Sequence, residues 1–362
     1  MSKDKVIIGM SGGVDSSVAA ALLLEQGYDV IGVTMKIWPE SLGQDKIKEG
    51  GCCSLSAVDD ARRVADQLGI PYYVMNFQEI FEQKVIDYFV DEYHKGRTPN
   101  PCIACNKHVK FDALLQKAVA MGVKYVSTGH YARIVYDDVR QRYLLKKSAT
   151  VSKDQTYALY NLTQQQLKHI LMPLGDYNKD QTREMAKKLG LGVASKPDSQ
   201  EICFVEDNNY ARFIHERTGN SGKPGYFVDT EGNVLGEHKG IIHYTVGQRK
   251  GLGIAFGKPM YVIAIDAENN KVILGESGQE YSEALIAGEP NFIPFDALDR
   301  ELRVTAKIRY SAKEAEAIIS PDASGKTVVK FSVPQRAVTP GQAVVFYDGD
   351  VLVGGGTIEK SL

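Results

Sequence analysis

The amino-acid sequence predicts three domains: an α/β domain with a doubly wound parallel sheet, a small mixed domain, and an antiparallel β-barrel. In the first half, β-branched runs alternate with segments whose apolar residues recur at helical spacing, which is typical of a parallel sheet covered by helices. From about residue 280, strand patterns separated by tight turns favour a barrel or a sandwich, and we expect the barrel. The expected bounds are 1–205, 206–279 and 280–362.

Each element of the first domain has a local signal. Strands are expected where β-branched and aromatic residues cluster, at 6–8, 29–34, 71–77 and 123–130. Helices are expected from residue 14 and at 56–68, 81–89 and 111–122. A last short helix near 207–217 precedes strand pairs at 226–236, 261–276 and 302–356. Because ligands bind beyond the carboxyl ends of parallel strands, the loop at 9–16, Met35 and Gly129 should meet.

Composition narrows the class of protein. The chain has 362 residues, of which 43% are hydrophobic, so it can form real cores. Its net charge of −2 excludes a global basic field, so any nucleic-acid binding would depend on local patches. We find no apolar run that could span a membrane and no signal-peptide pattern, so a cytoplasmic protein is expected. Five cysteines in a chain of this length argue against a disulfide framework.

The stretch SGGVDS, residues 11–16, lies between a predicted strand and a predicted helix. Gly12 and Gly13 allow the backbone to approach a ligand, and the helix N-terminus offers N–H groups and partial positive charge. These features together predict an anion site, most plausibly for phosphate. The stretch resembles the pyrophosphate loop (PP-loop) of the ATP pyrophosphatase superfamily. The alternative is a strand–helix turn that uses Gly and Ser only as turn and cap residues.

Two cysteines form a CxxC pair, Cys102 and Cys105, which follows Asn-Pro. Such a pair can be half of a zinc site, a redox dithiol, or two ligands of an iron–sulfur cluster. We expect a helix to begin just after the pair, and a thiol at a helix N-terminus has a lowered pKa and is more nucleophilic. Cys203, flanked by Ile202 and Phe204, would by itself be interpreted as a core cysteine.

The motifs SGGVDS, NPCIACN, GHYAR, SKDQTY and SQEICF occur in the order and spacing of the bacterial tRNA-specific 2-thiouridylases, and the resemblance covers nearly the whole chain. It implies a tRNA-uridine 2-sulfurtransferase that uses ATP. Enzymes of that family adenylate the wobble uridine, replace its 2-oxygen with sulfur, and release AMP and pyrophosphate. Implied partners are the anticodon region of tRNA and a persulfide donor or relay protein, and no membrane.

Carried over residue by residue, the resemblance implies four groups of site residues. ATP would be bound by Gly9, Met10, Ser11, Gly12, Gly13, Val14, Asp15 and Ser16, with Met35 and Gly129 near the adenosine. The catalytic residues would be Cys105 and Cys203. The target base would be contacted by Asn100, Pro101 and Cys102. Other tRNA contacts would be His130, Lys153, Asp154, Gln155, Arg309, Tyr310 and Gln342.

The implied chemistry leaves several points open. Cys203 would carry a persulfide, and Cys105 would release its sulfur or close a disulfide with Cys203. Mg²⁺ would accompany ATP, and Asp15 is either a Mg²⁺ contact or a helix-start residue. Some family members have an aspartate at the position of Cys102. Any acid–base role of that aspartate cannot be carried over to this chain, which has a cysteine there. Three thiolates could also hold a [4Fe–4S] cluster, but we favour the persulfide relay.

Two other functions remain as alternatives: an amide-forming PP-loop synthetase, and a non-catalytic RNA-binding or redox protein that binds ATP only as a ligand. Arg303, Lys307 and Arg309 alternate along a predicted strand, as a phosphate-facing stripe would. A glycine-rich segment of the central domain offers further candidates for RNA contact, or ordinary hairpin surface: His238, Lys239, His243, Arg249 and Lys250.

Overall fold

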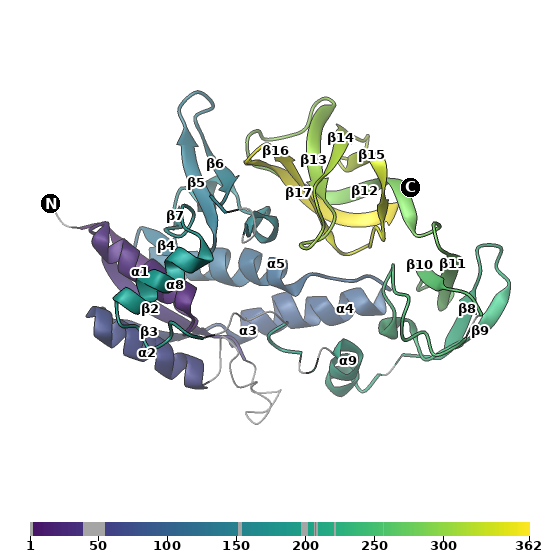
Figure 1. Cartoon of the computed structure of the whole chain (residues 1–362), viewed down its shortest axis with the longest axis horizontal. Helices are drawn as coiled ribbons and strands as arrows, with labels where there is room; N and C mark the ends of the chain where they lie inside the picture. The colour runs from purple at the N-terminus through teal and green to yellow at the C-terminus, as the bar shows by residue number, and fades with distance from the viewer. Residues whose placement is uncertain are drawn as a thin grey trace. The chain divides into compact units, whose positions relative to one another are not determined.

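The computed structural model describes residues 3–38, 55–150, 154–196, 202–205, 207, 209–220, 222–255 and 257–362. Its contacts divide the chain into two compact units, which are described separately (Figure 1). The first unit contains Met1–Val85, Cys102–Glu206 and Asp350–Leu352. The second contains Ile86–Pro101, Asp207–Gly349 and Val353–Leu362. The three expected domain boundaries stay a prediction.

The first unit is built on a parallel sheet, as predicted. Its strands run in the order β3-β2-β1-β4-β7 and are β1 Lys5–Gly9, β2 Asp29–Lys36, β3 Tyr72–Asn76, β4 Tyr125–Ser127 and β7 Ile170–Leu171. β1 is central, with Val6 paired to Val30 of β2 and to Tyr125 of β4. The strand order reverses at β1, so the loop after β1 is at the position where open α/β sheets bind ligands.

Helices pack on this sheet through small and branched apolar side chains. The main ones are α1 Val14–Glu25, α2 Leu55–Leu68 and α8 Lys179–Lys188. Val18 and Leu23 of α1 are fully buried with Ile8 of β1 and Ala186 of α8. Burying a valine or leucine contributes about 1.5–3 kcal/mol, so this core holds the start of α1 firmly against β1. A hairpin of β5 Ala132–Asp137 and β6 Arg142–Lys147, then η6 Thr156–Leu159 and α7 Gln164–Leu167, follow β4.

The helix that carries the CxxC pair begins earlier than we expected. It comprises α5 Pro101–Cys105, the π-helical η4 Asn106–Ala113 and α6 Leu114–Ala120. Both Cys102 and Cys105 are therefore inside the helix rather than before it. Proline favours the first helical position, where its missing N–H costs nothing, and this explains the start at Pro101. The preceding helices are α3 Gln78–Phe81, the π-helical η3 Glu82–Asp87 and α4 Tyr88–His94.

The second unit contains a small mixed part and a closed barrel. The small part has α9 Tyr210–Thr218, the turn η8 Ile241–His243, and a sheet ordered β10-β11-β8-β9, with β8 Gly225–Val228, β9 Val234–His238, β10 Met260–Asp266 and β11 Lys271–Glu276. The barrel strands are β12 Tyr281–Phe292, β13 Leu302–Lys307, β14 Ala315–Pro321, β15 Thr327–Arg336, β16 Ala343–Asp348 and β17 Val351–Ser361. β12 pairs with both β15 and β17, which closes the barrel and confirms the prediction.

Among the helices of the described ranges, none combines the length and the apolar character that crossing a membrane requires.

Candidate active site

The loop Gly9–Ser16 joins β1 to α1 and has the shape of an anion site. Gly12 has a φ of +65°, and a Cβ there would lie 2.2 Å from the Ala57 carbonyl oxygen, so only glycine fits. Ser17 donates its hydroxyl proton to the Gly13 carbonyl oxygen at 2.8 Å. Gly13 is the N-cap of α1 and no side chain caps the helix, whose N-terminus carries partial positive charge. The predicted strand–loop–helix is confirmed, and its ligand stays a prediction.

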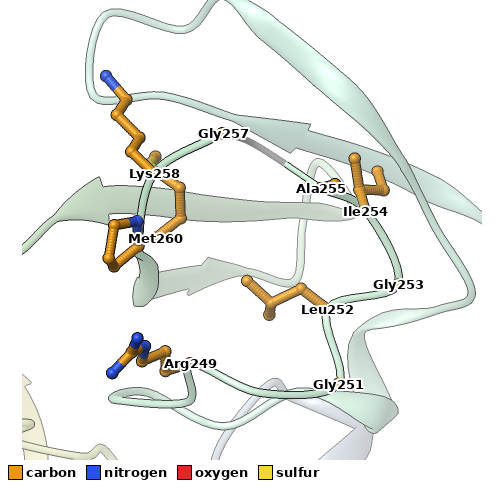
Figure 2. Close-up of a pocket in the computed structure, with 10 residues that line it drawn as sticks. Arg249, Gly251, Leu252, Gly253, Ile254, Ala255, Gly257, Lys258 and Met260 are labelled. Carbon is orange, nitrogen blue, oxygen red and sulfur yellow. The ribbon is translucent and has the colours of Figure 1, made fainter.

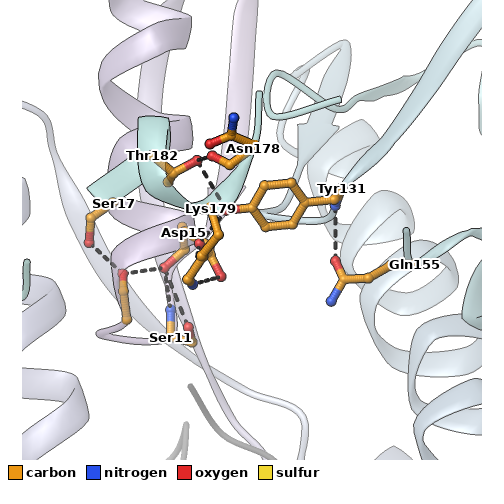
Figure 3. Close-up of polar contacts among 10 residues, drawn as sticks. Ser11, Asp15, Ser17, Tyr131, Gln155, Asn178, Lys179 and Thr182 are labelled. Carbon is orange, nitrogen blue, oxygen red and sulfur yellow. Dashed lines mark hydrogen bonds and ion pairs between the residues drawn. The ribbon is translucent and has the colours of Figure 1, made fainter. Parts of the chain in front are cut away.

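The carboxylate of Asp15, in the first turn of α1, is held by two side chains (Figure 3). Lys179 Nζ, from the first residue of α8, donates to Asp15 Oδ1 at 2.8 Å and to Oδ2 at 2.9 Å. The Tyr131 hydroxyl donates to Oδ1 at 2.8 Å and lies 3.0 Å from Thr182 Oγ1. The Lys179 side chain is only 10% exposed, against 32% for Asp15. The charge of Asp15 is therefore neutralised beside the loop.

A second lysine reaches the other side of the loop. Lys196 Nζ donates to the Gly12 carbonyl oxygen at 3.1 Å and to Asp60 Oδ2 at 2.9 Å. Sequence reasoning missed both Lys179 and Lys196, because each lies far along the chain from residues 9–16 and neither belongs to a motif. In the structure Asn178 forms a capping box at the start of α8, a pattern that marks a helix start and carries no signal for the contact with Asp15.

Met35 and Gly129 lie beside the loop, as the parallel topology predicts. A Cβ at Gly129 would lie 2.7 Å from the Ser16 nitrogen and 2.8 Å from the Asp15 carbonyl carbon. Met35 Cε would lie 3.5 Å from a Cβ at Gly9. The loop after β4 therefore packs directly on the first turn of α1, and only a residue without a side chain permits that approach. Contact with adenosine stays a prediction.

His130 packs against the helix that carries Cys105. Its ring centroid lies 5.7 Å from that of Phe111 in η4, and its Nδ1 lies 2.6 Å from Thr128 Oγ1. Burial, with a smaller effect from Lys110, holds the pKa of His130 well below its ordinary value of 6.5, so the imidazole is neutral. A neutral ring can contact tRNA by hydrogen bonding or stacking, and that role stays a prediction.

Cys102, Cys105 and Cys203 are present as thiols. Cys102 is exposed, whereas Cys105 and Cys203 are half-buried. The segment with Cys203 is anchored by Phe204, whose ring packs edge-on to Phe81 of α3 at 5.8 Å between centroids. α3 itself contacts η4, the continuation of the Cys105 helix. Phe204, next to Cys203, and η4, next to Cys105, therefore both contact α3, and the joint action of the two thiols stays a prediction.

Asp154 and Gln155 support their own loop. Asp154 accepts from the Ser148 nitrogen at 3.1 Å and from Thr156 Oγ1 at 2.6 Å. Gln155 Oε1 accepts from the nitrogen of Tyr131 at 2.9 Å, and the hydroxyl of the same tyrosine bonds to Asp15. Lys153 lies outside the described residues. The RNA contacts of this segment stay predictions.

In the second unit, Arg309 and Tyr310 present polar and aromatic surface on the barrel. Arg309 Nη1 donates to the Arg336 carbonyl oxygen at 3.0 Å. Tyr310 is 49% exposed, and Lys307 Nζ lies 5.7 Å from its ring centroid. A cation beside an exposed ring suits a nucleic-acid surface. Gln342 instead hydrogen-bonds to Thr98 and Pro99 of its own chain.

The central segment that offered RNA contacts divides into a buried and an exposed part. His238 is 3% exposed and bonds to the Asn270 carbonyl oxygen, so the expectation that it faces RNA is wrong. It fills a core position against Phe227. Arg249, by contrast, lines an open pocket with Lys258 and apolar side chains, shown in Figure 2.

The described residues do not fit a metal site built by the chain itself. No three of their His, Cys, Asp and Glu side chains gather closely enough to hold a metal ion. Both oxygens of Asp15 accept from Lys179, so a cation could bind there only after displacing the ammonium group.

Comparison with known proteins gives concordant results. The family model described as tRNA methyl transferase HUP domain matches residues 4–207, the tRNA methyl transferase PRC-barrel domain matches 211–276, and the aminomethyltransferase beta-barrel domain matches 282–358. The tRNA-specific 2-thiouridylase MnmA of Acetivibrio thermocellus is 69% identical over 359 residues, covering 99% of this chain and 100% of the relative. The protein of that name from Clostridioides difficile is 61% identical, with 99% of each chain covered.

Among solved structures, NMN synthetase from Francisella tularensis aligns over 60% of this chain and 78% of its own, at 16% identity and a TM-score of 0.34. That similarity is too low to support an argument. The full-length relatives and the three family models decide the assignment, and the chain belongs to the family of tRNA-specific 2-thiouridylases.

Proposed function

We propose that this protein uses ATP to replace the 2-oxygen of the wobble uridine of tRNA with sulfur. The observation that carries the proposal is the combination, in one unit, of a phosphate-type loop with two cysteine-bearing segments whose neighbouring residues contact α3. The descriptions of the family models refer to methyl transfer, but the full-length relatives are named 2-thiouridylases. Paired thiols suit the transfer of sulfur.

In the activation step, the loop Gly9–Ser16 and the N-terminus of α1 hold the phosphates of ATP. The uridine 2-oxygen attacks the α-phosphorus, and pyrophosphate leaves. A carbonyl oxygen is a poor leaving group, and this step converts it into AMP. The ion pair of Asp15 and Lys179 has no net charge, and the Lys196 ammonium group lies at the loop. Together they keep the loop from repelling the polyanionic nucleotide. Mg²⁺ would enter as a companion of the ATP phosphates.

In the transfer step, Cys203 carries a persulfide supplied by a donor or relay protein. The outer sulfur attacks C2 of the activated uridine and AMP leaves. The Cys105 thiolate then attacks Cys203 Sγ, which releases 2-thiouridine and leaves a Cys105–Cys203 disulfide. A thiol reductant then reduces this disulfide to two thiols and so supplies the two electrons that the transfer consumed. The tRNA contacts proposed above supply binding, and the cytoplasm supplies both ATP and tRNA.

The test separates the two steps. Cys105→Ser and Cys203→Ser should each lose thiolation while tRNA-dependent release of pyrophosphate persists, because the loop and the thiols act in different steps. Cys52→Ser and Cys53→Ser, whose positions lie outside the described residues, are matched controls and should keep full activity. Full thiolation without Cys203 would contradict the persulfide role.

Cys102 decides between the relay and a cluster mechanism. The relay needs Cys105 and Cys203 and should tolerate Cys102→Ser with a moderate loss of rate. A [4Fe–4S] cluster needs three thiolates, so Cys102→Ser would then be as damaging as Cys105→Ser. Purification without oxygen, an iron assay and the rate of Cys102→Ser distinguish the two. Stoichiometric iron with an inactive Cys102→Ser enzyme would replace the relay by the cluster.

A further inference from the structure

The segment Thr98-Pro99-Asn100-Pro101 connects α4 to α5 and contains two prolines. Each proline fixes its own φ, and each restricts the residue before it to extended backbone. Thr98 and Asn100 are the residues so restricted. Few torsions in this segment remain variable, so it transmits a constraint from one end to the other. Whatever holds Thr98 therefore also sets the placement of Asn100.

Thr98 is held through both of its backbone polar groups by the barrel turn at 339–342. Its nitrogen donates to the Pro340 carbonyl oxygen at 2.8 Å. Its carbonyl oxygen accepts from Gln342 Nε2 at 2.9 Å, and the same nitrogen lies 3.3 Å from the Pro99 carbonyl oxygen. The Thr98 hydroxyl donates to Thr245 Oγ1 at 3.3 Å. All of these residues belong to the second unit.

The turn that holds Thr98 is itself well braced. Gly341 has a φ of +90°, and its nitrogen donates to the Ile358 carbonyl oxygen at 2.8 Å. The Ile358 nitrogen in turn donates to the Gln342 carbonyl oxygen at 2.8 Å. A Cβ at Gly341 would lie 2.9 Å from both the nitrogen and the oxygen of Thr98. Turn and segment therefore fit each other at backbone distance, with no room for a side chain between them.

We infer that Gln342 is a positioning residue: its amide fixes Thr98 and Pro99, and through the rigid proline segment it sets the place of Asn100. This inference rests on the proposed function, in which Asn100 contacts the target base. It differs from direct contact between Gln342 and tRNA, because it makes the amide act on the chain's own backbone.

The two roles of Gln342 affect different measured quantities. A residue that binds RNA changes the Kd for tRNA, whereas a residue that aligns the reacting groups changes kcat for thiolation. A clamp on Thr98 also protects its amide from hydrogen exchange, whether or not tRNA or ATP is present. Exchange therefore tests the clamp independently of catalysis.

The experiment compares Gln342→Ala and the isosteric Gln342→Glu with Gln335→Ala. The Gln335 amide, in β15, bonds only locally to the Val333 carbonyl oxygen, so it is a matched control. We expect exchange at Thr98 to rise about tenfold and kcat to fall about tenfold in both Gln342 variants, since one hydrogen bond is lost. The Kd for tRNA should change less than about twofold, and Gln335→Ala should match the parent protein.

Unchanged exchange at Thr98, or a tenfold rise in Kd with kcat preserved, would overturn the inference. Faster exchange at Thr98 in the Gln342 variants, together with a parent protein that makes no 2-thiouridine, would support the clamp and refute the proposed function. Gly341→Ala provides a second variant, because its Cβ would push on the Thr98 backbone, and it should raise exchange there further.

Discussion

Lys179 Nζ donates to both carboxylate oxygens of Asp15, at 2.8 and 2.9 Å, across 164 residues of sequence. The pair joins the first residue of α8 to the first turn of α1, beside the loop proposed to hold phosphate. A carboxylate next to that loop would repel a nucleotide. The lysine removes this repulsion, and so α8 contributes to the site although it contains no loop residue.

Lys179→Met should therefore raise the KM for ATP by about tenfold or more, because it leaves the Asp15 charge uncompensated beside the phosphates. The free energy of unfolding should fall by about 1.5–3 kcal/mol, the usual cost of a hydrogen bond to a charged group. Adding Asp15→Asn to Lys179→Met should restore part of the ATP affinity. Steady-state kinetics and urea denaturation measure both effects.

The matched control is Lys188→Met on the same helix. Lys188 pairs with Glu184 at 2.8 Å, but both side chains are mostly exposed, so its loss should leave KM unchanged. Equal effects of the two lysine variants would show that the Asp15 pair has no special part in nucleotide binding.

Gly129→Ala should weaken ATP binding at least tenfold. Its new Cβ would lie 2.7 Å from the Ser16 nitrogen, and backbone cannot move aside as a flexible side chain can. The displacement of the first turn of α1 should also cost about 1–3 kcal/mol of stability. Gly192→Ala is the control, since no atom lies within 4 Å of a Cβ there. Normal ATP affinity in Gly129→Ala would mean that the loop is not held by β4.

Stability should fall as the pH drops below about 6.5, and His130 should account for part of the loss. Burial lowers its pKa in the folded state, so the unfolded chain binds the proton more readily. The contribution is fully present above the unfolded pKa and is lost as the pH falls toward the folded one. The slope is about 1.4 kcal/mol per pH unit for one proton.

His130→Gln should remove the contribution of His130, so the free energy of unfolding should change less steeply with pH. Urea titration between about pH 5 and 7.5 measures this. His238, whose pKa burial also lowers, is a second site of the same kind. The double variant should be flatter still. A slope that His130→Gln does not change would mean that folding leaves the pKa of His130 unaltered.

Affinity for tRNA should decrease steeply with salt despite the net charge of −2, because local lysines and arginines displace counterions from phosphates. Arg309→Ala should reduce the slope of log K against log salt by about one unit if it neutralises one phosphate. Arg300→Ala, at an exposed position of the same barrel domain, is the comparison. An unchanged slope and affinity in Arg309→Ala would remove Arg309 from the interface.

Sequence patterns predicted those strands, turns and helices that are determined by residues close to one another in the chain. The β-branched run before Gly9 and the glycines after it are sufficient to indicate strand, turn and helix start. The alternation of strands with helices along the first half indicated the parallel sheet, and the succession of strands and tight turns after residue 280 indicated the barrel.

Contacts between distant segments could not be predicted from such patterns. Lys179 has the sequence context of an ordinary capped helix, and only the packing of α8 on α1 takes its ammonium to Asp15. His238 was misjudged because its glycine-rich context was interpreted as an exposed loop, whereas it is the last residue of β9 and its ring faces the core. The helix start at Pro101 was placed too late because Asn-Pro was interpreted as a turn, although proline also suits the first helical position.

The most direct test of the central claim follows the fate of the uridine 2-oxygen. Purified protein is given ATP, a persulfide donor, and tRNA whose wobble uridine carries ¹⁸O at C2, and both products are analysed by mass spectrometry. The account predicts 2-thiouridine in the tRNA together with pyrophosphate and AMP that contains one ¹⁸O atom. Formation of 2-thiouridine with unlabelled AMP, or with ADP and phosphate in place of AMP and pyrophosphate, would contradict it.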